Sequence, residues 1–269
     1  MEQIRHVAMH AAQKAGELIS GNFQKLQNSD IQAKGKNDFV TRIDKEAESI
    51  ISHVIGQKFP DHRILAEESG LSRQNSEYLW VIDPLDGTTN FIQGIPHFSV
   101  SLALLIKGTV VFGLIYDPLS RECFHAAAGQ GAFLNESRIA VSRTSQLESA
   151  FGATGFPFKA PQFLEPYTGV FKVLMSRCQD MRRCGSAALD LAYTACGRYD
   201  FFWEAHLLPW DFMAGKLIVE EAGGKTSDFQ GRDLPVQTSS VLAANLPLYP
   251  LLLDVIRGNF SKSTGHSSR

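Results

Sequence analysis

The sequence predicts layered β-sheets covered by α-helices, and three observations support this prediction. Helical and strand-like apolar patterns alternate in blocks along the 269 residues. The composition, 44% hydrophobic and 20% charged, is ordinary for a globular chain that buries a large core. The pattern also changes character near residue 150, which indicates a boundary between two subdomains.

Two helices followed by a series of strands are expected in the first half. Apolar residues at helical spacing predict helices over 2–24 and 43–58, and the polar stretch 28–38 between them is expected to be a loop. Two long apolar segments separated by Lys107-Gly108 predict a β-hairpin. The expected strand regions are 63–68, 79–83, the hairpin 97–118, and shorter strands with turns over 121–142.

Helices predominate in the second half. The expected helices cover 161–178, 186–197, 210–224 and 247–258, and the expected strands cover 198–205, 225–229 and 240–245. The aromatic cluster 201–203 is interpreted as core or interface, because no basic stripe accompanies it as a nucleic-acid platform requires. Residues 259–269 predict a disordered tail.

Charge and hydropathy exclude several classes of function. The net charge of −2 gives no signal for binding nucleic acid or an anionic membrane. The longest strongly apolar stretch, 98–106, is too short to cross a bilayer, and the N-terminus lacks the apolar core of a signal peptide. The four cysteines show no C-x-x-C spacing, which favours reduced thiols in a cytoplasmic protein and argues against a Cys/His zinc site.

The segment WVIDPLDGTTNF (80–91) carries the clearest chemical signal. It places Asp83 and Asp86 at the end of an apolar strand, where two close carboxylates repel each other. Asp86 and Asp211 taken singly are also explained as helix N-caps, but capping does not explain Asp83 or the pair Glu67-Glu68. Carboxylate oxygens are the ligands that Mg²⁺ prefers, so this group predicts a divalent-metal site.

The residues around the two aspartates predict a phosphate site next to the metal. Pro84 restricts residue 83 to extended geometry and leaves the carbonyl of Leu85 as a neutral ligand. The backbone amides of Gly87, Thr88 and Thr89 are expected to point outward from a helix start, where anions bind. Metals beside such amides suit a phosphate ester, since they neutralise its charge and activate a water.

One rival mechanism is excluded by spacing. Phosphatases that form an aspartyl-phosphate carry D-x-D-G-T, whereas this chain reads D-x-x-D-G-T over 83–88. Leu85 occupies the position of the nucleophilic aspartate. Direct attack of a metal-bound water is therefore favoured over a covalent intermediate.

Several segments together resemble one family. AEESG (66–70), WVIDPLDGTTNF (80–91) and PWDFMAGKLIVEEAGG (209–224) are similar, in order and interval, to the signature segments of the inositol monophosphatase family. NDFVTRIDKEAE (37–48), GSAALDLAY (185–193) and GATGFPFK (152–159) extend the resemblance over residues 1–258, toward the bacterial inositol-1-monophosphatase branch.

The resemblance implies an α+β fold, a layered αβαβα sandwich of the inositol monophosphatase and fructose-1,6-bisphosphatase type. It implies a single catalytic domain over 1–258, Mg²⁺ dependence, inhibition by lithium and a homodimer. The implied substrate is myo-inositol monophosphate. Fructose-1,6-bisphosphate, nucleotide 3′-phosphates and histidinol phosphate are alternatives, and a regulatory protein that binds transcription machinery is the alternative from another class.

The resemblance also implies roles for individual residues. Glu67, Asp83, the Leu85 carbonyl and Asp86 would bind metal, and Asp211 would bind a second ion. Thr88 with Glu67 would orient the attacking water, and Asp44 would lie in the outer shell of the metal cluster. The substrate-binding residues it implies, together with the amides above, are Asp86, Gly87, Thr88, Thr89, Arg182, Glu204 and Asp211.

Some of these residues have simpler interpretations. Glu204 closes an aromatic strand, and Arg182 with Arg183 is also read as a solvated pair. His206 is interpreted as a loop or interface residue rather than a catalyst. Lys34 and Lys36 are candidates to cover a phosphate site, and a solvated polar loop is their simpler interpretation.

Overall fold

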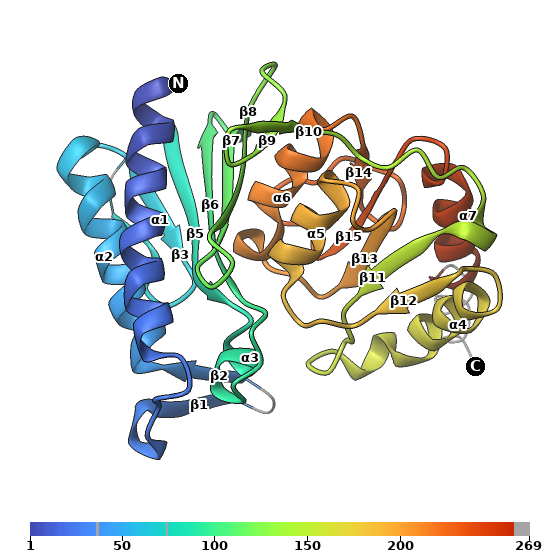
Figure 1. Ribbon diagram of the computed structural model, residues 1–269, viewed down its shortest axis with the longest axis horizontal. Helices are drawn as coiled ribbons and strands as arrows, with labels where there is room; N and C mark the ends of the chain where they lie inside the picture. The colour runs from blue at the N-terminus through green and yellow to red at the C-terminus, as the bar shows by residue number, and fades with distance from the viewer. Residues whose placement is uncertain (36–37, 74, 261–269) are drawn as a thin grey trace.

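The computed structural model describes residues 1–35, 38–73 and 75–260 and shows five layers (Figure 1). Helices α1 and α2 cover the outer face of a large sheet, α5 and α6 lie between that sheet and a smaller one, and α4 and α7 cover the outer face of the smaller sheet. This arrangement confirms the expected α+β sandwich.

The helices begin and end close to the predicted positions. Their bounds are α1 Glu2–Asn22, α2 Arg42–Lys58, α3 Thr88–Ile92, α4 Leu164–Met175, α5 Ala187–Ala195, α6 Pro209–Glu221 and α7 Tyr249–Phe260. Short 3-10 turns cover Asn28–Asp30, Leu147–Ser149 and Pro161–Phe163. Among the described residues, no helix combines the length and the apolar character that crossing a bilayer requires.

The large sheet has eight strands in the order β10-β9-β8-β7-β6-β5-β3-β4. Their bounds are β3 Arg63–Ala66, β4 Gly70–Leu71, β5 Tyr78–Asp86, β6 Ser99–Ile106, β7 Thr109–Asp117, β8 Glu122–Ala127, β9 Ala132–Leu134 and β10 Ser137–Ile139. Neighbouring strands are antiparallel except β3 and β5, which run parallel. The predicted hairpin is β6–β7, with Ile106 paired to Thr109 across the turn.

The small sheet has five strands in the order β12-β11-β13-β15-β14. Their bounds are β11 Phe151–Thr154, β12 Asp180–Arg182, β13 Phe201–Ala205, β14 Lys225–Ser227 and β15 Ser240–Ala244. The chain passes from the large sheet to this one between residues 139 and 151, which is where the sequence pattern changes character.

Side-chain alternation along the strands divides the core into three parts. On β5, Trp80 and Ile82 pack with α1 and α2, while Val81 packs with the middle helices. On β13, Phe202 faces the middle helices, and its neighbours Phe201 and Trp203 face α4 and α7. Successive side chains of a strand point to opposite faces, so both sheets are buried on both sides in this region.

Three local expectations differ from the structure. The stretch 28–38 contains strand β1 (Ile31–Gly35), which pairs with β2 (Asp38–Thr41), so the loop expectation was wrong. Strand β1 is mostly exposed and needs no apolar face, so it is invisible to apolar periodicity. Strands β11 and β12 were not expected, because four and three residues are too few to show a pattern.

Part of the segment predicted as a disordered tail is helical. Residues 259 and 260 form the last turn of α7, and the rest of the expected tail lies outside the described residues. Lys36 and Asn37, named above in the loop and the resemblance, lie outside them as well.

Candidate active site

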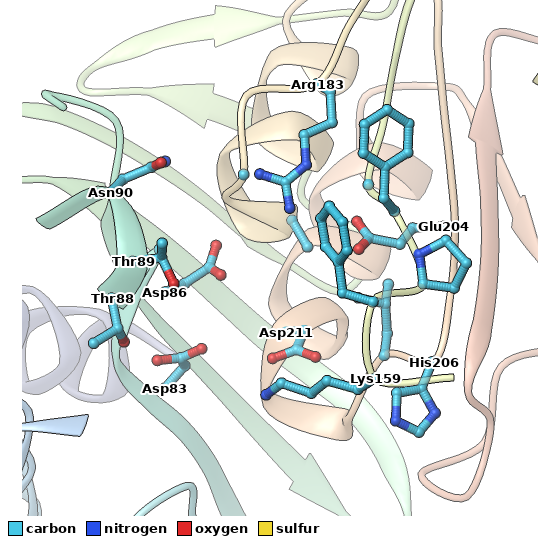
Figure 2. A pocket seen from close by; sticks show the side chains of 18 of the residues that line it. Asp83, Asp86, Thr88, Thr89, Asn90, Lys159, Arg183, Glu204, His206 and Asp211 are labelled. Carbon is cyan, nitrogen blue, oxygen red and sulfur yellow. The ribbon is translucent and has the colours of Figure 1, made fainter. Parts of the chain in front are cut away.

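A cavity of about 480 Å³ opens where the end of β5 meets the starts of α5 and α6 and the end of β13 (Figure 2). Most of the residues singled out from the sequence line it, namely Glu67, Asp83, Leu85, Asp86, Gly87, Thr88, Thr89, Glu204 and Asp211. Both sheets and the helix layer between them contribute, so the cavity exists only when the two halves of the chain pack together.

Parallel pairing of β3 with β5 brings the first two carboxylates together. Ala66 pairs with Ile82, and the amide of Glu67 donates to the Ile82 carbonyl at 3.2 Å. Glu67 and Asp83 therefore leave adjacent strands at the same edge of the sheet. Asp83 is 2% exposed, which makes an uncompensated charge there costly.

A bulge in β5 separates Asp83 from Asp86. Asp83 pairs with Ser101 and Asp86 with Ser99, so Pro84 and Leu85 oppose one residue of β6. Pro84 cannot donate to the ladder, and the Leu85 amide instead donates to Asp83 Oδ1 at 3.0 Å. The extra residue bends the strand and turns both aspartates toward the cavity.

Asp86 and Asp211 each accept hydrogen bonds at the start of a middle-layer helix. Asp86 does not cap its own helix α3, whose N-cap is Gly87; its Oδ2 accepts from the Ser186 hydroxyl and, at 2.8 Å, from the Ala188 amide at the start of α5. Asp211 lies in the first turn of α6 and accepts from the Leu208 amide at 2.7 Å. Neither aspartate is therefore the N-cap that the simpler interpretation of the sequence proposed, since the N-caps of α3 and α6 are Gly87 and Leu208, but both line the cavity while they accept hydrogen bonds at helix starts.

Burial raises the pKa of all four carboxyls, and neighbouring carboxylates add to the shift at Glu67, Asp83 and Asp211. Burial raises the pKa of Glu67 to about 7, although Lys34 opposes the shift. Burial also raises the pKa of Asp86 to about 6, less than it would without the bonds from Ser186 and Ala188. The pKa values of Asp83 and Asp211 lie well above the ordinary range, because burial and neighbouring carboxylates both favour the neutral form.

Two lysines approach the carboxylate group. Lys34 on β1 forms ion pairs with Glu67, at 3.4 Å, and with Glu68. Lys159 lines the cavity, and its amino group points into the cavity on the side of Asp83 and Asp211 (Figure 2). Both positions indicate a strongly negative potential that attracts cations.

Thr88 links the cavity to a buried aspartate on α2. Its hydroxyl Oγ1 lies 2.9 Å from Asp44 Oδ1 and 3.0 Å from the Leu85 carbonyl, both acceptors. Asp44 is 1% exposed and also accepts from the Thr41 amide at 2.9 Å, so its position is fixed. The residue before Thr88, Gly87, has φ +95°, and an added Cβ would lie 2.9 Å from the His97 carbonyl. Only glycine fits that turn without strain.

The structure places Arg183, rather than Arg182, on the cavity wall. Arg183 lines the cavity and its guanidinium lies over Phe156 and Phe158, at 5.7 and 5.4 Å from the ring centres. Arg182 ends strand β12, pairs with Asp180 at 2.5 Å and lies over Phe151. The sequence choice of Arg182 is corrected by this placement, because successive residues at the end of a strand point in opposite directions.

The Glu204 carboxylate lies against the backbone of Gly155 and lines the cavity. A Cβ added at Gly155 would lie 1.8 Å from Glu204 Oε1, so the carboxylate rests on the bare backbone of that glycine. Burial raises the pKa of Glu204 to about 8, with Arg183 opposing the shift and Asp86 adding to it. Figure 2 shows Glu204 across the cavity from Asp86, on the same side as Arg183. Neither Gly155 nor Phe158 was singled out from the sequence.

His206 also lines the cavity, from the loop between β13 and α6. It is exposed and has φ +68°, an uncommon conformation for a residue with a side chain. Glu68, the other member of the acidic pair, is absent from the lining among the described residues and is held by Lys34.

The donor set fits a hard divalent cation. The expected ligands are all oxygens: the carboxylates of Glu67, Asp83, Asp86 and Asp211 and the carbonyl of Leu85, which all belong to residues that line the cavity. In the described part of the chain no three of these carboxylates have ligand atoms within 4.8 Å of one another. They surround a space instead of closing on one point, which suits cations held together with an anionic ligand.

Comparisons with known proteins agree with this geometry. Nus factor SuhB of Escherichia coli K12 is 46% identical over 262 residues, which cover 97% of this chain and 98% of that protein. The crystal structure of the extragenic suppressor protein SuhB from Bartonella henselae has a TM-score of 0.92 and 39% identity, and the match covers 95% of this chain and 98% of that one. An IMPase from Thermotoga maritima has a TM-score of 0.89 and 34% identity, with 98% of this chain and 100% of that one covered. The profile of the inositol monophosphatase family matches residues 1–260, and the chain therefore belongs to this family.

Proposed function

We propose that the protein is a Mg²⁺-dependent phosphomonoesterase that hydrolyses myo-inositol monophosphate to myo-inositol and phosphate. Family membership supports phosphatase chemistry in general. The observation that carries the proposal is the ring of carboxylates with raised pKa values beside the Gly87 turn, of which Asp83 is buried and the others are half-buried. Such a group is stable in its charged form only with cations, and cations with a phosphate complete it.

Each part of the chain has a role in this proposal. Bound Mg²⁺ would neutralise the phosphate and activate a water for direct attack. The carboxylates of Glu67, Asp83, Asp86 and Asp211 and the Leu85 carbonyl would hold the ions. The amides of Gly87, Thr88 and Thr89 would hold the phosphate oxygens in line with the attacking water.

Thr88 would orient the attacking water together with Glu67. The single hydroxyl proton of Thr88 is directed to Asp44 or to the Leu85 carbonyl. The remaining lone pairs of Oγ1 can then accept a hydrogen bond from water. Asp44 would act as a positioning residue, since it touches Thr88 and is itself buried.

The opposite wall would recognise the alcohol. Glu204 offers a carboxylate to a ring hydroxyl, and Arg183 offers donors on a rigid planar group. Asp86 and Asp211 would also face the alcohol. Fructose-1,6-bisphosphate, nucleotide 3′-phosphates and histidinol phosphate remain alternatives, and kcat/KM values for this panel at fixed Mg²⁺ would rank them. The proposal includes a cytoplasmic location, a homodimer and inhibition by lithium.

Removal of metal should abolish hydrolysis. Excess chelator should reduce turnover of inositol monophosphate to background, and Mg²⁺ should restore it, because the ions supply both charge neutralisation and water activation. The measurement is phosphate release over time, with the monovalent salt concentration held constant as a control. Full activity in chelator would contradict the proposal.

The two neighbouring arginines provide a matched test of the substrate wall. Arg183→Ala should lower kcat/KM by about one to two decades, since a hydrogen bond to a charged group contributes about 1.5–3 kcal/mol. Arg182→Ala removes the same side chain one residue earlier, where it pairs with Asp180 outside the cavity, and should leave kcat/KM within about twofold. An equal fall of kcat/KM in both variants would contradict a role for Arg183 in substrate binding.

Glu204 should govern the choice of alcohol and not the chemistry. Glu204→Gln should lower the ratio of kcat/KM for inositol monophosphate to that for an aryl phosphate by about one to two decades, because the aryl ester lacks the hydroxyl partner. Asp211→Asn should instead lower both values, by about 10²–10³.

Gly155→Ala tests the same contact without removing the carboxylate. The new Cβ would displace the Glu204 side chain, so the ratio should fall in the same direction as in Glu204→Gln. An unchanged ratio in both variants would make Glu204 a strand-end residue without a role in substrate choice.

A second candidate function rests on the names of relatives. The relative from Escherichia coli is called a Nus factor, which denotes a transcription-related role for that protein. We propose binding of transcription machinery as a second function that would coexist with hydrolysis, on the basis of the 46% identity to that relative over 97% of this chain.

Asp83→Asn separates the two functions. This variant should lose hydrolysis, since it removes a carboxylate from the metal site. Binding to purified bacterial RNA polymerase, followed by co-elution in gel filtration, should be the same for the parent and the variant. If neither protein co-elutes with the polymerase, the second candidate function is withdrawn.

A further inference from the structure

Behind the wall that carries Arg183, three side chains with nitrogen, sulfur and oxygen donors converge. They are His97, which follows α3, Cys184, which follows Arg183, and Asp190 on α5. One potential ligand atom from each lies within 4.8 Å of the other two. The three residues come from separate segments, so the tertiary fold creates the cluster.

Two of these donors are buried without a partner. Asp190 is 1% exposed, and neither its Oδ1 nor His97 Nε2 has a hydrogen-bond partner within the described residues. These two atoms face each other at 3.9 Å, too far for a hydrogen bond. A buried carboxylate oxygen and a buried imidazole nitrogen normally find partners, because leaving them unpaired is costly.

The third donor, the Cys184 thiol, has one weak polar contact. The closest polar contact of Cys184 Sγ among the hydrogen bonds is the Tyr199 hydroxyl at 3.6 Å, a weak interaction for sulfur. Cys184 is not in a disulfide. Burial raises the pKa of its thiol, so a metal that binds there displaces the thiol proton.

We propose that His97, Cys184 and Asp190 form a second cation site, which takes a borderline-soft divalent ion such as Zn²⁺. Mixed nitrogen, sulfur and oxygen donors suit Zn²⁺ and do not suit Mg²⁺. Tetrahedral bonds of about 2.0 Å to nitrogen and oxygen and about 2.3 Å to sulfur place the ligand atoms about 3.3–3.5 Å apart. His97 Nε2 and Asp190 Oδ1 lie 3.9 Å apart, so this pair would need to approach by about 0.6 Å, which rotation of the short Asp190 side chain would allow.

The site lies next to residues that line the active-site cavity. The Asn90 side-chain amide donates to the His97 carbonyl at 2.7 Å and to the Cys184 carbonyl at 2.8 Å, and Asn90 itself lines the cavity. A metal joining His97 to Cys184 would therefore hold the two segments that Asn90 already connects. Since Cys184 directly follows Arg183, the ion would have a structural role that fixes the position of the Arg183 wall.

Cysteine spacing in the sequence argued against a zinc site. That reasoning considered ligands close together in sequence, as in zinc fingers. Here the ligands are at positions 97, 184 and 190 and meet only through packing of α5 against the large sheet.

Cobalt substitution tests the site independently of hydrolysis. The reduced full-length protein is saturated with Mg²⁺ and titrated with Co²⁺, while the near-ultraviolet thiolate-to-cobalt charge-transfer band is recorded. No cysteine is among the described residues of the active-site cavity, so cobalt bound there gives no such band. The parent protein should show the band with a stoichiometry of one, and competing Zn²⁺ should remove it.

Matched variants identify the ligands. Cys184→Ser should lose the band, whereas Cys178→Ser, which alters another partly buried free thiol, should keep it. Asp190→Asn keeps the thiol and should weaken Co²⁺ binding by about tenfold or more, which provides a second readout if Cys184→Ser does not fold. Zn²⁺ should raise the Tm of the parent but not that of Cys184→Ser.

Three results would overturn the proposal. They are the absence of the band in the reduced parent, its persistence in folded Cys184→Ser, and equal Co²⁺ affinity in the parent and Asp190→Asn. None of them bears on the carboxylate cavity, whose metal dependence is measured by phosphate release.

Discussion

Repulsion among carboxylates buried in one cavity is the constraint on which the rest of the structure depends. Burial raises the pKa of Asp83, Asp86, Asp211 and Glu67, and acidic neighbours raise it further at Asp83, Asp211 and Glu67. A fold keeps such a group only if other interactions hold each side chain in place. The bulge in β5, the parallel pair β3–β5 and the starts of α5 and α6 supply those interactions.

The middle helix layer connects stability with function. Helices α5 and α6 pack between the sheets through apolar side chains such as Leu191 and Ile218, and their N-terminal ends open on the cavity. The amides there donate to Asp86 and Asp211, and the positive end of a helix favours a negative charge. Packing of the core therefore sets the positions of two carboxylates from opposite halves of the chain.

Much of this arrangement could be predicted from the sequence, and the rest depended on contacts that sequence patterns do not record. Apolar periodicity located α1, α2 and the β6–β7 hairpin, and the unusual pairing of acidic residues with strand ends pointed to the cavity residues. The orientation of Arg183 relative to Arg182 depends on β12, which has three residues and no alternation to read. The need for glycine at position 155 arises from its contact with the Glu204 carboxylate, 49 residues later in the sequence, and no local pattern indicates that contact. The His97, Cys184 and Asp190 cluster is likewise a product of packing.

The most direct test of the central claim is the position of bound metal. A crystal grown with Mn²⁺ as a substitute for Mg²⁺ should show anomalous difference peaks in the cavity, about 2.0–2.2 Å from oxygens of Asp83 and Asp86, with a further peak beside Asp211. Peaks at these carboxylates would establish that cations relieve the repulsion around which the site is built. A cavity without anomalous density, at a Mn²⁺ concentration that supports hydrolysis in solution, would contradict the account.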